Sequence, residues 1–176
     1  SLLPTAALAD EAGTKPVKID KTTGETTEYE TLDAAITAAK DGDTITILKA
    51  AENESGYKLN GNLTYSGKAI TIKAADGTNV KFDMSAAVAL HGAKITFEGV
   101  TFDYKTNGNY IGIQHADTLV YNNCTINGQV FLYAASETFN GCTFNQDSAG
   151  AYNVWTYAAK KVEFNHCAFN CVGRSV

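Results

Sequence analysis

Three near-copies of one short segment carry the residues most able to do chemistry in this chain. They read YNNCTIN at 121–127, FNGCTFN at 139–145 and FNHCAFN at 164–170. A cysteine thiolate is a nucleophile and a metal ligand, and two neighbouring cysteines can form a disulfide. The repeated segments are either copies of a functional motif or repeats of the fold itself. The secondary structure that positions the cysteines decides between these alternatives.

A period of about 25 residues extends well beyond these segments. Successive spacings between six strand-like segments are 25, 25, 24, 18 and 25 residues. The third residue of each is apolar or aromatic: Ile47, Ile72, Phe97, Tyr121, Phe139 and Phe164. Repeats of this length are typical of solenoids, in which each repeat packs on its neighbours.

Each repeat contains three short strand patterns. In the last repeat, apolar residues alternate with polar ones at 162–164 and at 167–169, with a two-residue bend between them. A third pattern, VWTY at 154–157, has counterparts at 130–133, 111–114 and 87–90. Such alternation predicts strands, and residues 50–176 show no helical periodicity. The sequence therefore predicts an all-β fold, a right-handed parallel β-helix of about six coils of about 25 residues.

One segment before the repeats has the pattern of a helix. In TLDAAITAAKDGD, Thr31 is a predicted N-cap, Gly42 ends the helix, and apolar residues recur at helical spacing. A solenoid exposes its core at each end and needs a cap. We expect a capping helix at 31–41, flanked by a hairpin of strands at 17–20 and 26–29.

The segment YETLDAAITAAKDGDTITIL at 29–48 resembles the opening of right-handed β-helix proteins of the pectate-lyase-like superfamily. It is most similar to their repetitive relatives in secreted surface proteins of Gram-positive gut bacteria. The resemblance covers about residues 17–176. It implies the β-helix fold and an adhesin-like role. The pectate lyases themselves use acidic Ca²⁺ ligands and a basic residue, usually arginine, whereas the single arginine here is Arg174, near the end of the chain.

Residues 1–14 are predicted to be a signal-peptide remnant or a disordered tail. Ala7 and Ala9 precede acidic residues, as at a signal-peptidase site. This predicts a secreted or cell-surface protein in which 15–176 form a single domain of a longer chain. The net charge of −5, with one arginine, argues against nucleic-acid binding, and no run of eighteen apolar residues predicts a membrane span. The segment NCVGRSV at 170–176 carries no capping signal, which makes end-to-end contact through an open C-terminal coil possible.

The cysteines fall at one position of the repeat, which predicts a structural column inside the core. Its members are Val100, Cys124, Cys142 and Cys167. Buried free cysteine behaves as a small hydrophobic residue. A disulfide between neighbours stays an alternative, because the strand spacing of about 4.8 Å is compatible with it. A straight column lacks tetrahedral ligand geometry, so we assign no metal, and Cys171 lies outside the column.

The asparagines form two further columns. Asn122, Asn140 and Asn165 fall at the bend, and Asn127, Asn145 and Asn170 follow the last inward apolar residue. Stacked asparagines can hydrogen-bond to one another along a solenoid, so we predict two asparagine ladders.

Aromatic residues supply the candidate binding site. If Val130, Leu132, Val154 and Thr156 point inward, four aromatic residues of the same strands point outward. The opposite phase, with the rings inside, is the alternative. Loops 103–110 and 145–153 adjoin these strands. The candidate ligand-binding residues are Phe131, Tyr133, Trp155, Tyr157, Tyr110 and Tyr152.

These observations predict a non-catalytic binding module that recognises a glycan or a host protein such as an immunoglobulin. A polysaccharide lyase or hydrolase and a structural spacer are the alternatives. His91 and His115 align at one bend near Asp117, but no chain of base and nucleophile is visible. We assign neither catalytic residues nor cofactors.

Overall fold

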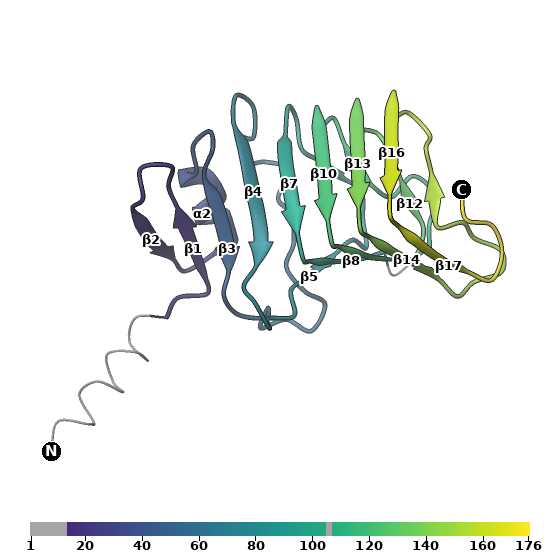
Figure 1. The fold of residues 1–176 in the computed structure, drawn as a ribbon, viewed down its shortest axis with the longest axis horizontal. Helices are drawn as coiled ribbons and strands as arrows, with labels where there is room; N and C mark the ends of the chain where they lie inside the picture. Colours follow the sequence, from purple (N-terminus) through teal and green to yellow (C-terminus); the bar gives the residue numbers. More distant parts are fainter. Residues whose placement is uncertain (1–13, 105–106) are drawn as a thin grey trace, which may run out of the picture.

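The computed structural model describes residues 14–104 and 107–176, which form a parallel β-helix of about five turns with one short helix. The predicted β-helix is confirmed, with about five turns in place of about six. Successive strands of the largest sheet stand side by side along the molecule (Figure 1). Residues 1–13 of the predicted tail, and Lys105 and Thr106 of the loop at 103–110, lie outside the described residues.

Three faces of the coil correspond to three sets of strands. The first sheet has the order β16-β13-β10-β7-β4-β3-β1-β2, the second β17-β14-β11-β8-β5, and the third face carries the pairs β6-β9 and β12-β15. The strands of the first sheet are β1 (Val17–Asp20), β2 (Thr26–Tyr29), β3 (Thr44–Ile47), β4 (Ala69–Ala74), β7 (Lys94–Glu98), β10 (Thr118–Asn122), β13 (Ser136–Asn140) and β16 (Lys161–Asn165). Those of the second are β5 (Lys81–Asp83), β8 (Thr101–Asp103), β11 (Thr125–Asn127), β14 (Thr143–Gln146) and β17 (Ala168–Cys171). The pairs are β6 (Val88–Ala89) with β9 (Ile113–Gln114) and β12 (Val130–Phe131) with β15 (Val154–Trp155).

The predicted register holds from β4 to β16. Ile72 is aligned with Phe97, and the anchors of β10, β13 and β16 follow in register. The first step differs, because Ile72 pairs with Ile45 and not with Ile47. The first coil is thus two residues longer than the period indicates. A shift of two residues keeps the same side chains inward, so the core pattern survives it.

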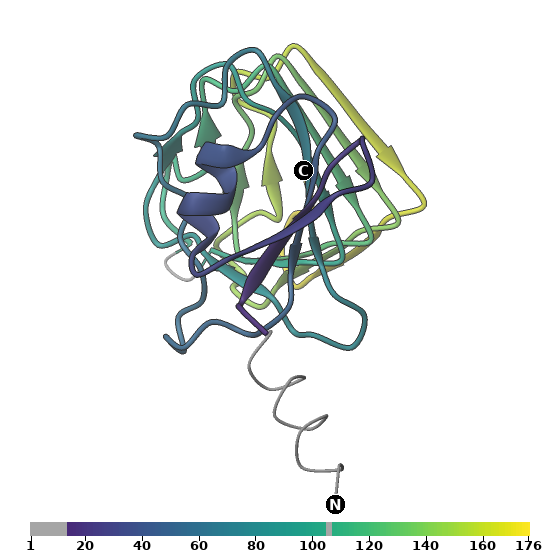
Figure 2. The same cartoon turned by 90° about the vertical axis from the view of Figure 1, so that its left-hand side faces the viewer.

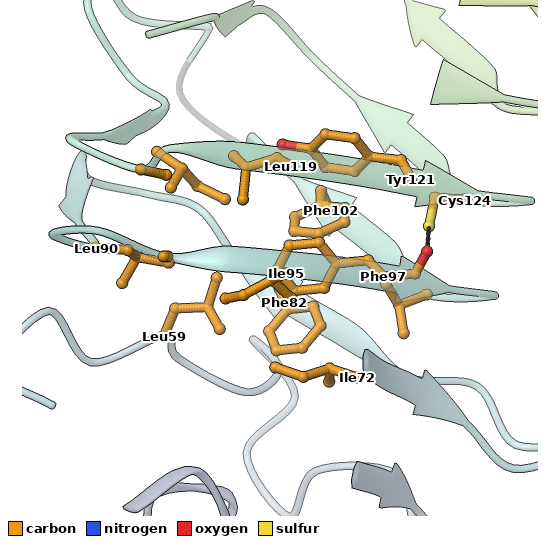
Figure 3. Packing of buried hydrophobic residues seen from close by; sticks show 14 of the residues in the cluster. Leu59, Ile72, Phe82, Leu90, Ile95, Phe97, Phe102, Leu119, Tyr121 and Cys124 are labelled. Carbon is orange, nitrogen blue, oxygen red and sulfur yellow. Dashed lines mark hydrogen bonds between the residues drawn. The ribbon is translucent and has the colours of Figure 1, made fainter. Parts of the chain in front are cut away.

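Stacked aromatic rings fill the interior between the first two sheets (Figure 3). Tyr121 and Phe139 stack with ring centroids 4.3 Å apart and planes at 8°, and Phe144 and Phe169 do so at 4.8 Å and 6°. The two stacks meet edge to face, as between Phe139 and Phe144 at 5.0 Å and 63°. Both geometries are favourable for aromatic pairs, so each coil is attached to the next by its rings.

The bend between the first and second sheets uses a left-handed residue in every coil from β7 onward. Gly99, Asn123, Gly141 and His166 have φ values between +52° and +65°. Glycine and asparagine tolerate this region best. The bend directs the chain from one sheet into the next, and it places the residue that follows in the core.

Both predicted asparagine ladders are present. At the bend, Asn140 donates to Asn122 and Asn165 donates to Asn140, each at 2.9 Å. In the second ladder, Asn145 donates to Asn127 and Asn170 donates to Asn145, each at 3.0 Å. Every step joins neighbouring coils outside the apolar core, so the ladders hold the coils in register.

A short helix, α2 (Leu32–Ala38), lies across the N-terminal end of the solenoid, as Figure 2 shows. Thr31 is its N-cap, with the Oγ1 atom accepting from the amide of Ala34 at 3.1 Å. The helix ends at Ala38, before the predicted boundary at residue 41. Ala39 leaves the helical conformation (φ −62°, ψ 142°), and the Nζ of Lys68 donates to the carbonyls of Ile36 (2.6 Å) and Ala39 (3.2 Å) at this end of the helix. Among the described residues no helix is long and apolar enough to cross a membrane.

One buried carboxyl group interrupts the apolar core. Glu137 is 2% exposed and occupies an inward column whose other members are Ile70, Ile95, Leu119 and Val162. Its carboxyl group accepts from the Tyr121 hydroxyl (3.0 Å) and from the Ala134 amide (3.3 Å). Burial raises the pKa of Glu137 to about 8, and these hydrogen bonds offset only part of that effect.

We expect the stability of this domain to fall as pH rises from about 4.5 to about 8. The folded state keeps a proton on Glu137 that the unfolded chain releases in this range, so the contribution is full below pH 4.5 and lost above the folded pKa. Glu137→Gln stays neutral and should be more stable than the wild type at pH 9, by a few kcal/mol (~1.4 kcal/mol per pKa unit). Urea unfolding from pH 4 to pH 9 measures this difference.

Glu163→Gln is the matched control, because Glu163 lies in the adjacent strand on the exposed side and pairs with Lys161 at 3.3 Å. Its pH profile should follow that of the wild type. Parallel profiles for wild type and Glu137→Gln would contradict a buried neutral carboxyl group at this position.

Candidate functional site

Six aromatic side chains form one connected group on the outer side of the β12-β15 face. We call this group the aromatic cluster. Its members are Tyr110, Phe131, Tyr133, Tyr152, Trp155 and Tyr157, and each is in ring contact with at least one other. These are the six residues proposed from the sequence as ligand-binding residues, and the fold brings all of them together.

The strands have the phase that places the rings outward. Val130, Leu132 and Val154 belong to the hydrophobic core, whereas Phe131 does not. Thr156 was expected to point inward but is exposed. The reason is that β15 ends at Trp155 and a turn follows, closed by the bond from the Ala159 amide to the Thr156 carbonyl at 2.9 Å.

Phe131 forms the base of the aromatic cluster. It is in register with Trp155, and the two rings stack at 5.4 Å with planes only 7° apart. Tyr110 and Tyr157 cover it further at 5.4 Å and 5.7 Å, so Phe131 is only 4% exposed although it lies outside the core. The preceding coil has Gly112 here, where a Cβ atom would lie 1.9 Å from the Phe131 carbonyl oxygen.

Two tyrosines and the tryptophan are the most exposed members of the cluster. Tyr157 is 60% exposed, Tyr110 is 55% and Trp155 is 38% exposed. Tyr157 lies edge-on to Tyr110 and Tyr133, each at 5.5 Å. The cluster therefore presents ring edges and phenol hydroxyls above a buried base.

The backbone that carries Tyr110 is held in an unusual conformation. Tyr110 has a φ of +67°, which is uncommon for an aromatic residue. The hydroxyl of Tyr133 donates to the Tyr110 carbonyl at 3.1 Å. This bond ties the loop to the turn of the next coil and fixes the ring of Tyr110 over Phe131.

Two buried glutamines anchor the loops beside the aromatic cluster. Gln129 Oε1 accepts from the Tyr152 amide at 2.8 Å, and its Nε2 donates to the carbonyls of Asn107 and Gly108 at 3.4 Å. Gln146 Nε2 donates to Asn107 Oδ1 (3.0 Å) and to the Tyr152 carbonyl (2.9 Å). Both loops are thus fixed to the solenoid. Sequence reasoning missed these glutamines, because their partners lie in loops outside the repeat.

Arg174 borders the aromatic cluster at Tyr152. Its Nη1 donates to the Tyr152 hydroxyl at 2.8 Å, and its guanidinium carbon lies 5.7 Å from the centroid of that ring. Tyr152 in turn lies 4.5 Å from Trp155, with ring planes at 59°. A cation over an aromatic ring is a favourable arrangement, and the guanidinium group adds hydrogen-bond donors to the edge of the surface.

Cys124, Cys142 and Cys167 lie in the predicted column. Cys124 and Cys142 are buried, whereas Cys167, in the last coil described, is half-buried. Each Sγ atom contacts a backbone carbonyl of the preceding coil: Cys124 that of Phe97 at 3.5 Å (Figure 3), Cys142 that of Tyr121 at 3.2 Å and Cys167 that of Phe139 at 3.3 Å. All four cysteines are free, and Cys171 lies apart from the column, with its Sγ 3.0 Å from the Arg174 carbonyl.

Other groups that could bind a ligand or react lie outside the aromatic cluster. The rings of His91 and His115 stack face to face, with centroids 4.6 Å apart and planes at 7°. A polar groove of about 660 Å³ runs along the second asparagine ladder between Asp103 and Asn170. Among residues 14–104 and 107–176, no group of three or more His, Cys, Asp or Glu side chains could hold a metal ion.

Comparison of the chain with models of known protein families, with curated proteins and with solved structures found no match in any of the three.

We expect Gln129→Leu to loosen the loop that carries Tyr152. The substitution leaves the Tyr152 amide without its acceptor, and an unpaired buried amide costs about 1–3 kcal/mol. Urea unfolding measures the loss of stability, and hydrogen exchange at the Tyr152 amide should accelerate more than exchange in β10 and β13. Asn62→Leu changes an exposed amide side chain in the same way and should leave both quantities unchanged. Unchanged exchange at Tyr152 in Gln129→Leu would show that the loop is held by other contacts.

Proposed function

We propose that this domain is a non-catalytic binding module and that the aromatic cluster is its contact surface. One observation carries the proposal: aromatic side chains from successive coils form a connected outward network on anchored backbone, although the core does not need them. Apolar residues scattered singly on a surface need no explanation, whereas a connected, partly exposed aromatic group indicates an interaction site.

The cluster is suited to binding because it is ordered before a ligand arrives. Binding costs free energy when side chains and loops must be immobilised, and a preorganised surface avoids much of this cost. Here the ring of Phe131 is packed on all available sides, and Gln129 and Gln146 hold the adjoining loops. Exposed Tyr157, Tyr110 and Trp155 then supply the residue types that dominate binding energy at interfaces.

The ring geometry favours a protein ligand over a glycan. A sugar ring stacks on an open aromatic face, but Trp155 stacks on Phe131 and also contacts Tyr152. What the cluster presents instead is a mixture of ring edges, phenol hydroxyls and the guanidinium group of Arg174. Tyrosine, tryptophan and arginine are the residues enriched in the centres of protein interfaces. A glycan remains the second candidate, with Tyr157, the most exposed ring, as its stacking residue.

The biological setting of the proposal comes from the sequence. The resemblance of residues 29–48 to pectate-lyase-like β-helices, and to adhesin-like surface proteins of Gram-positive gut bacteria, supports a secreted or cell-surface location. In that setting the partner is a host protein, of which an immunoglobulin is one instance, or a host glycan.

The lyase or hydrolase alternative needs a different surface. It is tested by incubating the domain with polyuronides and Ca²⁺ and following the formation of unsaturated products. A spacer role predicts that no ligand is bound by the aromatic cluster at all, so the binding experiment below also tests that alternative.

We expect Trp155→Ala and Tyr157→Ala each to weaken binding of the ligand by at least about thirtyfold, since hot-spot residues contribute ~2 kcal/mol or more. The ligand is first identified by presenting the intact domain to arrays of serum proteins and of glycans, and its affinity is then measured by titration calorimetry. Val172→Ala is the control, because Val172 is exposed but lies outside the cluster. Unfolding curves establish that the variants are folded. Binding that survives in both aromatic variants would exclude the aromatic cluster as the contact surface.

A further inference from the structure

The column of Cys124, Cys142 and Cys167 places thiols at one position in three consecutive coils. The register is set on both sides of the column, because Asn122, Asn140 and Asn165 are aligned before it and the residues at 125, 143 and 168 after it. We call these three cysteines the thiol column. Cys124 and Cys142 are buried, and Cys167, in the last coil described, is half-buried.

The sulfur atoms follow one another in the same orientation. Each contacts the carbonyl of the residue two before the equivalent bend in the preceding coil, at 3.2–3.5 Å. Because the Cβ vectors of aligned parallel strands are parallel, the sulfurs keep roughly the strand spacing of about 4.8 Å. A disulfide needs sulfurs about 2.05 Å apart and Cβ vectors that converge, which this arrangement does not offer.

The same spacing fits one metal ion between two thiolates. A metal–thiolate bond is roughly 2.3 Å long in zinc sites, so two such bonds in a line span about 4.6 Å, close to the distance between neighbouring coils. Zinc itself needs four ligands, and among the described residues no group of three or more ligating side chains converges. Soft thiolates select Cu(I), and a linear pair of sulfurs in an apolar interior satisfies a soft monovalent ion with two bonds.

We propose that the thiol column binds one soft monovalent metal ion, Cu(I) or its analogue Ag(I), as a linear bis-thiolate between Cys142 and one neighbouring cysteine of the column. Two S–H bonds break, two metal–sulfur bonds form, and two protons pass to the solvent without any change in oxidation state. Cys142 is the shared ligand because it has a thiol in the coil on either side, whereas Cys124 and Cys167 each have one.

Metal uptake by the thiol column is coupled to pH, because each of the two cysteines must lose its proton to bind the ion. Uptake should therefore release two protons and weaken as the pH is lowered.

The experiment is a competition for Cu(I) under anaerobic conditions. The intact domain is titrated into a chromophoric Cu(I)–chelator complex, the loss of chelator colour gives affinity, and native mass spectrometry gives the number of ions per chain. Wild type is expected to take up one Cu(I), with an ultraviolet sulfur-to-copper absorption band. Its thermal midpoint should rise with Cu(I) concentration, because the ion binds the folded column.

Cu(I) binding is compared among cysteine variants, and the thiol column predicts which of them lose the ion. Cys142→Val places in this coil the residue type that occupies the equivalent position at Val100, and it should lower Cu(I) affinity at least about tenfold. Cys124→Val and Cys167→Val should each keep one bound ion, because each leaves one pair intact. The double variant of Cys124 and Cys167 leaves Cys142 alone and should lose the ion, which tests the proposal even where Cys142→Val fails to fold. Cys171→Ala lies outside the column and should bind as the wild type.

Three results would overturn the proposal. The first is that the wild type takes up no Cu(I) from the chelator. The second is that Cys142→Val binds Cu(I) as tightly as the wild type, and the third is that Cys171→Ala abolishes Cu(I) binding. A mass loss of two daltons on treatment with oxidised glutathione, dependent on Cys142, would show that two sulfurs approach to bonding distance, and this would contradict the fixed spacing on which the proposal rests. None of these measurements depends on the aromatic cluster or on its ligand.

Discussion

Stacking of each coil in register on the next is the constraint on which the rest of this structure depends. Neighbouring strands lie about 4.8 Å apart, so a side chain that points inward must fit its counterpart in the coil above and in the coil below. Flat rings meet this requirement when their planes are parallel, as Tyr121 and Phe139 are at 8°. The cap formed by α2 keeps the N-terminal end of that stack closed, and the asparagine ladders keep its coils aligned.

The same constraint explains why apparent motifs recur. An asparagine at a bend gains a hydrogen bond only if the next coil has an asparagine at the same place, as Asn140 does between Asn122 and Asn165. A cysteine is small enough to follow the left-handed bend residue and still point into the core. The repetition around the cysteines is therefore first a property of the scaffold, and any chemistry of the thiols follows from their alignment.

Features imposed on every coil could be predicted from the sequence, whereas features of a single coil could not. The strands, the ladders and the capping helix follow from periodicity and from helix-capping residues. The longer first coil escaped prediction, because a shift of two residues leaves the inward pattern unchanged. Glu137 left a readable signal, a charged residue in a column that is otherwise isoleucine, leucine and valine, but its partner Tyr121 lies in another coil.

For the candidate site, the six aromatic residues could be identified from alternation and from the adjoining loops. Their mutual support could not be, because the turn after Trp155, which brings Tyr157 over Phe131, interrupts the strand pattern. The loop anchors Gln129 and Gln146 join segments 22 and 39 residues from Asn107, and no repeat connects these positions.

An outward ring receives no support from the core and must be supported by its neighbours. Phe131 obtains that support from Trp155, Tyr110 and Tyr157, and it is buried although it lies outside the core. A group of rings selected only for stability would bury its outer members as well, yet Tyr157 and Tyr110 keep more than half of their surface exposed. The cluster thus divides into a buried base, which a ligand never touches, and an exposed layer held in place by that base. This division gives different roles to residues of the same type. Loss of the Phe131 ring would disorder the exposed rings that it supports, whereas loss of the Tyr157 ring would remove a direct contact with the ligand.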